Sequence, residues 1–166
     1  ECDSELREWI DSTDAGDRMT SHGYFRVGTT SDALKSIGMK DGNIIWRKSK
    51  IGYIMEEHPE MTVDVLAQVP EIIEKPIVVL KSKTRSDSIV IFGNLAAANG
   101  NSVMAAIDLT PKANGRMEAD FSLISSAYSR ADGNLKNLLK TSEYLYLDKN
   151  RAASWLMQLR VQFPSG

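Results

Sequence analysis

The residues from Lys50 to Met61 hold the side chains best suited to acid–base chemistry. A histidine titrates near neutral pH, so His58 can give and take protons, and Glu60 follows it as a base or as a partner that orients the imidazole. Lys50 precedes His58 by eight residues, and on one helix this spacing places the two side chains roughly 80° apart. They can therefore border one cleft. A histidine at a helix end and a glutamate at a helix start are also typical of side chains that face the helix dipole.

A second group of side chains follows a strand that we predict at residues 118–124. It consists of hydroxyl-bearing residues and an arginine, namely Ser125, Ser126, Tyr128 and Arg130. Hydroxyls and an arginine at the end of a strand are well placed to hold a phosphate. They are also ordinary turn residues, so the composition leaves both interpretations open.

Basic residues form local clusters in a chain whose net charge is −2. The first 20 residues hold seven acidic and two basic side chains, so the remainder is mildly basic. The two clusters are Arg47, Lys48 and Lys50, and then Lys75, Lys81, Lys83 and Arg85. Lys81 and Lys83 are candidates to meet the phosphates of a substrate by Coulomb attraction, although charge runs are also typical of solvated faces.

The sequence speaks against several classes of site. Two histidines and a single cysteine, Cys2, make a structural zinc site improbable, and we expect no metal and no cofactor. Phosphate-loop and dinucleotide patterns are absent, as is the Gly-flanked serine of a Ser–His–Asp hydrolase. No apolar run approaches the roughly 20 residues of a membrane helix. The missing initiator methionine suggests a fragment or a processed chain.

Apolar spacing and capping residues predict the elements that must position these side chains. Helices are expected at 4–10, 32–37, 49–57, 62–69, 71–74, 134–140 and 150–159. Strands or short apolar runs are expected at 24–28, 44–46, 77–80, 88–92, 103–109, 118–124, 144–147 and 160–163. Pro59 pushes the preceding residue out of the α region, so the helix at 49–57 should end near His58. Asn99-Gly100 and Asn114-Gly115 are turn signals.

This order of elements predicts an α+β fold. Helices come first, an antiparallel β-meander of four to five strands follows, and a helix closes the chain. Residues 1–20 form an acidic, polar lead-in with one helix, and residues 21–166 form a single α+β domain. We find no internal repeat and no low-complexity linker.

Several short motifs in this order resemble the C-terminal domain of phage MuF-type head proteins. They are Ser49-Lys50-Ile51 with Met55, His58-Pro59-Glu60-Met61, Val69-Pro70, Lys75-Pro76-Ile77, Ser125-Ser126-Ala127-Tyr128, Tyr144 to Asn150, Trp155-Leu156 and Gln162-Phe163-Pro164. The resemblance runs from about residue 27 to residue 164. The ending Arg160 to Pro164 departs from the Gly-Leu-Gln-Leu-Pro type of run expected there.

The resemblance implies a module of a phage or a polymorphic toxin. Such domains are grouped with the barnase, EndoU, colicin and RelE-like nucleases, which have N-terminal helices followed by an antiparallel sheet and cleave RNA without metal. The resemblance therefore implies that the 2′-hydroxyl attacks the adjacent phosphorus and yields a cyclic phosphate. A general base and acid must move two protons, and cationic or hydrogen-bonding groups must stabilise the phosphorane.

Under this hypothesis each candidate residue has a role. His58 is the general acid or base, Lys50 and Arg130 bind charge, and Ser125, Ser126 and Tyr128 orient the phosphate. Glu60 is a base or orients His58, and Lys81 and Lys83 bind the substrate. Trp155 and Tyr146 are expected in the core rather than in base stacking.

The expected partners are an RNA substrate, a cognate immunity protein and a larger phage or toxin polypeptide to which the domain is attached, with no membrane. The domain would act in the cytoplasm of a target or host bacterium or travel with the virion. The alternative is a non-catalytic module of a phage head-associated protein that binds nucleic acid or a partner. ADP-ribosyl transfer ranks last, because no convincing Arg/Ser/Glu signature is present.

Overall fold

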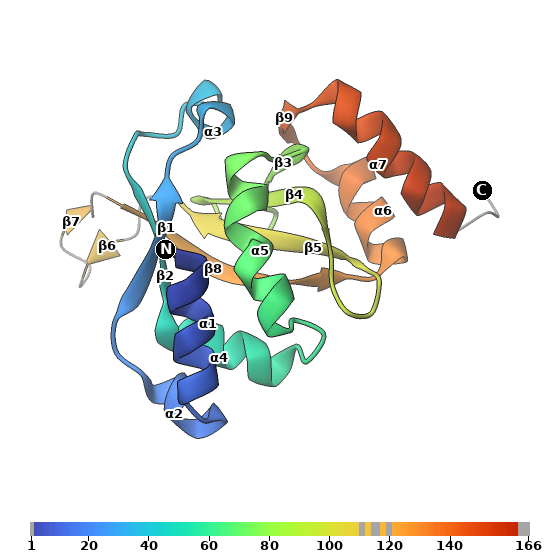
Figure 1. Ribbon diagram of the computed structural model, residues 1–166. Helices are drawn as coiled ribbons and strands as arrows, with labels where there is room; N and C mark the ends of the chain where they lie inside the picture. The colour runs from blue at the N-terminus through green and yellow to red at the C-terminus, as the bar shows by residue number, and fades with distance from the viewer. Residues whose placement is uncertain (1, 110–111, 114–116, 119–120, 163–166) are drawn as a thin grey trace.

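The computed structural model describes residues 2–109, 112–113, 117–118 and 121–162 (Figure 1). In this part of the chain the fold is α+β, with seven helices and a seven-stranded mixed sheet. The helices are α1 (Cys2–Ser12), α2 (Ala15–Thr20), α3 (Asp32–Ser36), α4 (Lys48–Glu57), α5 (Val63–Glu74), α6 (Asp132–Thr141) and α7 (Lys149–Gln162). The strands are β1 (Tyr24–Thr29), β2 (Asn43–Arg47), β3 (Val78–Lys81), β4 (Ser88–Ala96), β5 (Ser102–Asp108), β6 (Lys112–Ala113), β7 (Met117–Glu118), β8 (Phe121–Arg130) and β9 (Tyr144–Leu147).

The main sheet has the strand order β1-β2-β8-β5-β4-β3-β9. The predicted antiparallel meander is present in β3, β4, β5 and β8, with the small β6–β7 pair inserted before β8. The sheet is nevertheless larger and mixed, because β1 and β2 form a hairpin and β2 pairs with β8 in parallel. The prediction of four to five antiparallel strands is therefore only roughly right.

Helices cover the two faces of the sheet unequally (Figure 1). The first core lies between the sheet and α1, α4 and α5, and contains Trp46 and Leu66. The second core lies under α6 and α7, where Phe92 and Trp155 pack with their rings 5.9 Å apart. Burial of each large apolar side chain contributes about 1.5–3 kcal/mol, so both cores stabilise the sheet that carries the candidate residues.

Helix α5 corrects the expectation that Pro70 would separate two helices. The helix runs without a break from Val63 to Glu74, with Pro70 inside it and the Thr62 hydroxyl capping its start. A proline costs a helix one N–H donor and crowds the preceding turn. Here five apolar side chains of α5 are buried in the first core, and this packing outweighs the cost; they are Val65, Leu66, Val69, Ile72 and Ile73.

The C-terminal strand that we predicted at 160–163 is also wrong. Helix α7 continues through Gln162, and Phe163 lies outside the described residues, as does the predicted turn at 114–115. The helix begins as expected, because the Asp148 carboxylate accepts a hydrogen bond from the N–H of Arg151 at 3.2 Å.

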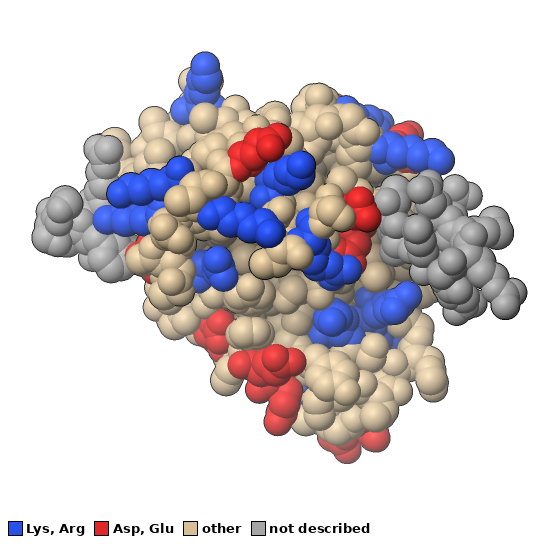
Figure 2. Space-filling model, turned by 180° about the vertical axis from the view of Figure 1, so that it is seen from behind, with Lys and Arg blue, Asp and Glu red and all other residues tan. Residues whose placement is uncertain are grey.

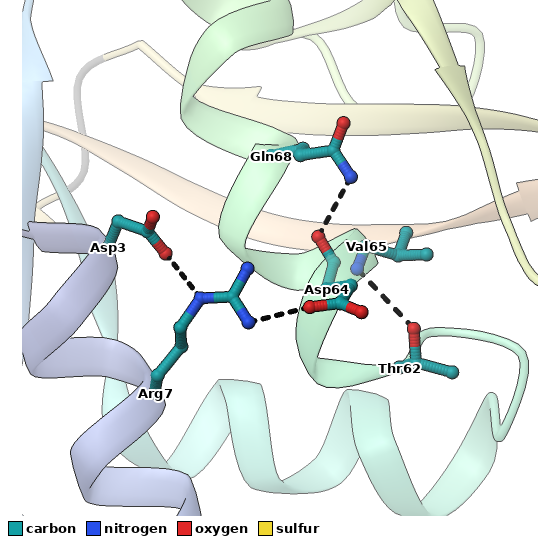
Figure 3. A network of polar contacts seen from close by, with 6 residues as sticks. All are labelled: Asp3, Arg7, Thr62, Asp64, Val65 and Gln68. Atoms are coloured by element: carbon teal, nitrogen blue, oxygen red, sulfur yellow. Dashed lines mark hydrogen bonds and ion pairs between the residues drawn. The ribbon is translucent and has the colours of Figure 1, made fainter.

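The acidic N-terminal segment holds two helices where one was expected, and both contact the rest of the fold. Leu6 and Ile10 of α1 are buried in the first core. Arg7 bridges two helices, because its guanidinium contacts Asp3 at 2.8 Å and Asp64, in the first turn of α5, at 2.6 Å (Figure 3).

Helices α2 and α4 touch at a glycine. A Cβ atom on Gly52 of α4 would lie 2.6 Å from the carbonyl carbon of Arg18 and 2.7 Å from the backbone nitrogen of Met19. Only a residue without a side chain lets the two backbones approach this closely.

Candidate active site

The end of helix α4 positions His58, which directly follows the last helical residue. The backbone N–H of His58 donates to the carbonyl of Ile54 at 2.8 Å, and His58 then leaves the helical conformation with φ −130° and ψ 77°. The following residue is Pro59, which disfavours a helical residue before it. The predicted helix end at His58 is thus confirmed.

Strand β8 supplies the surface against which His58 packs. Strand β2 pairs with β8 only at residues 121–123, and the chain then turns from β2 directly into α4, which contacts β8. The imidazole of His58 consequently stacks on the ring of Tyr128, with centroids 4.7 Å apart and an interplanar angle of 10°. The His58 side chain keeps 32% of its surface exposed, so a ligand can reach it.

Glu60 lies close to Nδ1 of the imidazole. Its Oε2 atom is 3.8 Å from Nδ1 of His58 and accepts a hydrogen bond from the Ser129 hydroxyl at 2.8 Å. The Asn99 side chain donates to the same hydroxyl at 3.2 Å. Because Nδ1 of His58 faces a carboxylate, Nε2 is the ring nitrogen left to serve a substrate.

Glu60 is held in its ionised form by its surroundings. Burial raises the pKa of this carboxyl, but hydrogen bonds from the Ser129 hydroxyl and from the backbone of Glu60 and Ser129, together with the charge of His58, outweigh burial and lower it below its ordinary value of 4.5. Glu60 also ties the loop after α4 to the turn between β4 and β5, since its backbone carbonyl accepts a hydrogen bond from the N–H of Ala98 at 3.2 Å.

This lowered pKa predicts a pH-dependent contribution to stability. The ionised Glu60 stabilises the fold above its unfolded-state pKa, and this contribution disappears as the pH falls through the lower folded-state pKa. We therefore expect Glu60→Gln to lower the free energy of unfolding at about pH 7 and to lower it less at about pH 3. Urea unfolding of both proteins across this range measures the gap, and a gap of constant size would contradict the prediction.

Arg130 lies beside the stacked pair. Its guanidinium carbon is 6.0 Å from the centroid of the Tyr128 ring, within the range of a cation–π contact. Among the described residues, neither Nε of Arg130 nor Oδ1 of the neighbouring Asp132 has a hydrogen-bond partner, although both atoms are buried. Burial raises the pKa of Asp132, and the charge of Lys136 opposes this effect.

The two remaining hydroxyl candidates lie farther along β8. The segment from Ser125 to Arg130 is strand rather than the predicted turn, because it pairs with β5 throughout. Ser125 sits at a bulge and donates to the carbonyl of Ala106 at 3.2 Å, while Ser126 pairs opposite Ala106. At roughly 3.3 Å per residue, Ser125 is about 10 Å and Ser126 about 7 Å from Tyr128 along the strand.

The lysine candidates do not join His58. Lys50 is exposed in the first turn of α4, about 12 Å from His58 along the helix axis. Lys81 and Arg130 lie at opposite ends of the sheet. Lys81 pairs with Ile89 near the start of β4, whereas Arg130 pairs with Ser102, which in turn pairs with Ala96 at the end of β4. Along β4 the distance from Ile89 to Ala96 is roughly 24 Å. Lys83 lies beyond Lys81 and donates to the Thr141 hydroxyl.

Sequence reasoning missed two residues that position the site, Ser129 and Asn99. Ser129 lies within the hydroxyl-rich segment, but nothing in the sequence indicated that its side chain, rather than those of its neighbours, would face Glu60. Asn99 was assigned only to a turn, and the turn is confirmed, with Gly100 at φ +83°. Its second role depends on the pairing of β5 with β8.

The described part of the chain contains no cluster of three His, Cys, Asp or Glu side chains that could hold a metal ion. Within the same residues, none of the helices combines the length and apolarity needed to cross a membrane.

The chain matches the model of a known family. Residues 50–154 match the model of the phage MuF C-terminal domain, which is more than half of the chain. The match begins and ends inside the stretch of residues 27–164 that the motifs suggested, and it includes His58, Glu60 and all of β8. Comparisons with curated proteins and with solved structures found no match.

Proposed function

The chain belongs to the phage MuF C-terminal domain family, and on this premise we propose that it is a metal-independent ribonuclease module of a phage or polymorphic-toxin protein. In this proposal His58 is a general acid or base. RNA is the substrate, a cognate immunity protein is a partner, and the module acts in the cytoplasm of a target or host bacterium or travels with the virion. Family membership supports only the phage origin and attachment to a larger phage protein.

The observation that carries the proposal is the setting of His58. A partly exposed imidazole stacks on Tyr128, turns Nδ1 toward a carboxylate and has an arginine within reach of the same tyrosine ring. A proton-transfer group, a group that orients it and a cation that can bind phosphate are the parts that phosphodiester cleavage needs.

The chemistry follows from these positions. The 2′-oxygen loses its proton and bonds to phosphorus, the bond from phosphorus to the 5′-oxygen breaks, and the leaving oxygen takes up a proton. His58 transfers one of these protons through Nε2 and solvent water carries the other, while Glu60 orients the ring and stabilises its positive form. Arg130 stabilises the charge on the phosphorane, and the Tyr128 hydroxyl orients the phosphate.

The other candidates would act away from the bond that breaks. Ser125 and Ser126, farther along β8, would hold neighbouring phosphates. Lys50, Lys81 and Lys83 are separated from His58 by at least two helical turns or by most of a strand, so they would contact only more distant parts of an RNA.

The test is to incubate the purified protein with mixed RNA in an excess of a metal chelator. We expect cleavage to persist and the fragments to carry cyclic phosphate and 5′-hydroxyl ends, because attack by the 2′-hydroxyl leaves those groups. Cleavage that needs added divalent metal would overturn the proposal, as would fragments with 5′-phosphate ends.

A second candidate function is a non-catalytic module that binds nucleic acid or a partner for a phage head-associated protein. The hydrogen bonds of Glu60 to Ser129 and of Asn99 to Ser129 favour it, because they fasten a loop to the sheet without requiring catalysis. This alternative predicts salt-sensitive binding without turnover, and the same incubation separates the two.

A further inference from the structure

The second face of the sheet is only half covered. Helices α6 and α7 pack over β3, β4 and β5 to form the second core. Strands β1, β2 and β8 contribute almost no residue to this core. We call the part of this face that these three strands form the open strip. Its six key side chains are Tyr24, Arg26, Arg47, Ser126, Tyr128 and Arg130.

The strand register places these side chains on one face. Directly paired residues of neighbouring strands point to the same side. Tyr128 is opposite Met104, a member of the second core, so Tyr128 and the residues two positions away from it share that face. Phe25 and its partner Trp46 belong to the first core, so their neighbours Arg26 and Arg47 point to the opposite side.

The open strip is basic. Arg26 and Arg47 are exposed, and Arg130 lies at its far end. Asp108, on the same face, is already bound by Arg85 at 2.9 Å and by the Ser88 hydroxyl. Figure 2, which views the molecule from this side, shows Lys and Arg side chains spread across it, with a few Asp and Glu between them. The described part of the strip therefore presents a net positive surface.

The strip also carries aromatic rings. Tyr24 is 60% exposed and pairs with Arg47 across the hairpin, and Tyr128 lies beside Arg130 at the other end. Arginines that follow a phosphate backbone and aromatic rings on which unpaired bases stack are the two parts of a single-strand binding surface. A duplex keeps its bases stacked inside and cannot use such rings.

We propose that the open strip binds single-stranded RNA and leads it to His58. Arg26 and Arg47 hold phosphates at one end, and Arg130 holds the phosphate next to the histidine. Tyr128 joins the two regions, because it belongs to the strip and stacks on His58. The direction of the strand toward His58 rests on the proposed function, whereas binding to the strip does not.

The test uses the full chain with His58→Ala, which prevents cutting, and a fluorescent RNA of about 12 nucleotides, within the usual footprint of single-strand binders. The variant Arg26→Ala/Arg47→Ala is compared with Lys35→Ala/Lys40→Ala, which removes the same charge from α3 and the loop after it. We expect the arginine variant to bind at least about tenfold more weakly. The slope of log Kd against log salt concentration should fall by about 1.4, because each phosphate contact to a single strand contributes about 0.7 to that slope.

Three results would contradict the proposed role of the open strip. They are unchanged RNA binding by an arginine variant that unfolds at the native temperature, an equal loss of affinity in the lysine control, and equal affinity of the protein for duplex and single-stranded RNA. A DNA strand of the same sequence is expected to bind more weakly, and equal binding would remove RNA as the ligand class. If the arginine variant binds RNA more weakly but the protein with His58 cuts no RNA, the open strip binds RNA as proposed and the nuclease proposal is wrong. If the protein with His58 cuts RNA, and Arg26→Ala/Arg47→Ala with His58 retained cuts dilute RNA equally fast, the proposed role of the open strip is wrong and the nuclease proposal is not.

Discussion

Replacing His58 by alanine is expected to slow RNA cleavage by about 10²- to 10⁴-fold, the usual contribution of a general acid or base. The substitution removes the imidazole that stacks on Tyr128 and stays partly open to solvent. Cleavage of a defined RNA under single-turnover conditions measures the loss. Added imidazole should restore part of the rate, because it replaces the missing proton carrier.

The chain provides a matched control in His22. It is the other histidine, it is exposed, and it lies in the connection between α2 and β1. His22→Ala should cleave RNA at the parent rate. Loss of the stack on Tyr128 costs about 0.5–1.5 kcal/mol, so thermal unfolding must accompany the assay. A folded His58→Ala variant that cuts as fast as the parent would rule out His58 as the acid or base.

Gly52→Ala is expected to lower the stability of the fold markedly, although it adds only one methyl group. The new Cβ would lie 2.6 Å from one backbone carbon of α2 and 2.7 Å from a backbone nitrogen. Backbone atoms inside a helix cannot move aside as a flexible side chain can, so α2 and α4 must separate. Overpacking of this kind costs about 1–3 kcal/mol, which urea unfolding measures directly.

Gly133→Ala is the matched control for this substitution. Gly133 is also in a helix, α6, and a Cβ there would meet no atom within 4 Å. Alanine favours a helix over glycine by up to about 1 kcal/mol, so this variant should be as stable as the parent or slightly more stable. Equal free energies of unfolding for the two variants would contradict the close approach at Gly52. Because α4 carries His58, Gly52→Ala should also slow any cleavage.

Local elements of the fold could be predicted because their signals are local. The helix that ends at His58 follows from apolar residues at Ile51, Ile54 and Met55 and from the proline that comes next. The strands of the meander follow from apolar runs between turn signals. The parallel pairing of β2 with β8 could not be predicted, because it joins residues such as Ile45 and Leu123 that no short-range pattern links.

The candidate site shows the same division. The chemistry of His58 and Glu60 was visible in one short segment, and Tyr128 and Arg130 in another. Hydroxyl-rich composition suggested a turn at Ser125 to Arg130, but the buried Ala127 and the pairing with β5 keep the segment in the sheet. The angle between Lys50 and His58 around the helix allows both to border one cleft, but it says nothing of their distance along the helix axis. Whether these residues act on RNA stays a prediction.

The hydrogen bond between Ser129 and Glu60 joins residues that are 69 positions apart, and this has a consequence during synthesis. At roughly 5–20 residues per second, about 3–14 s separate the appearance of Glu60 from that of Ser129 on the ribosome. Until β8 has emerged, His58 has neither the ring it stacks on nor the hydroxyl that holds its carboxylate partner. The site is therefore completed only when most of the domain has left the exit tunnel, and under the proposed function a nascent chain is expected not to cut the RNA of the ribosome that makes it.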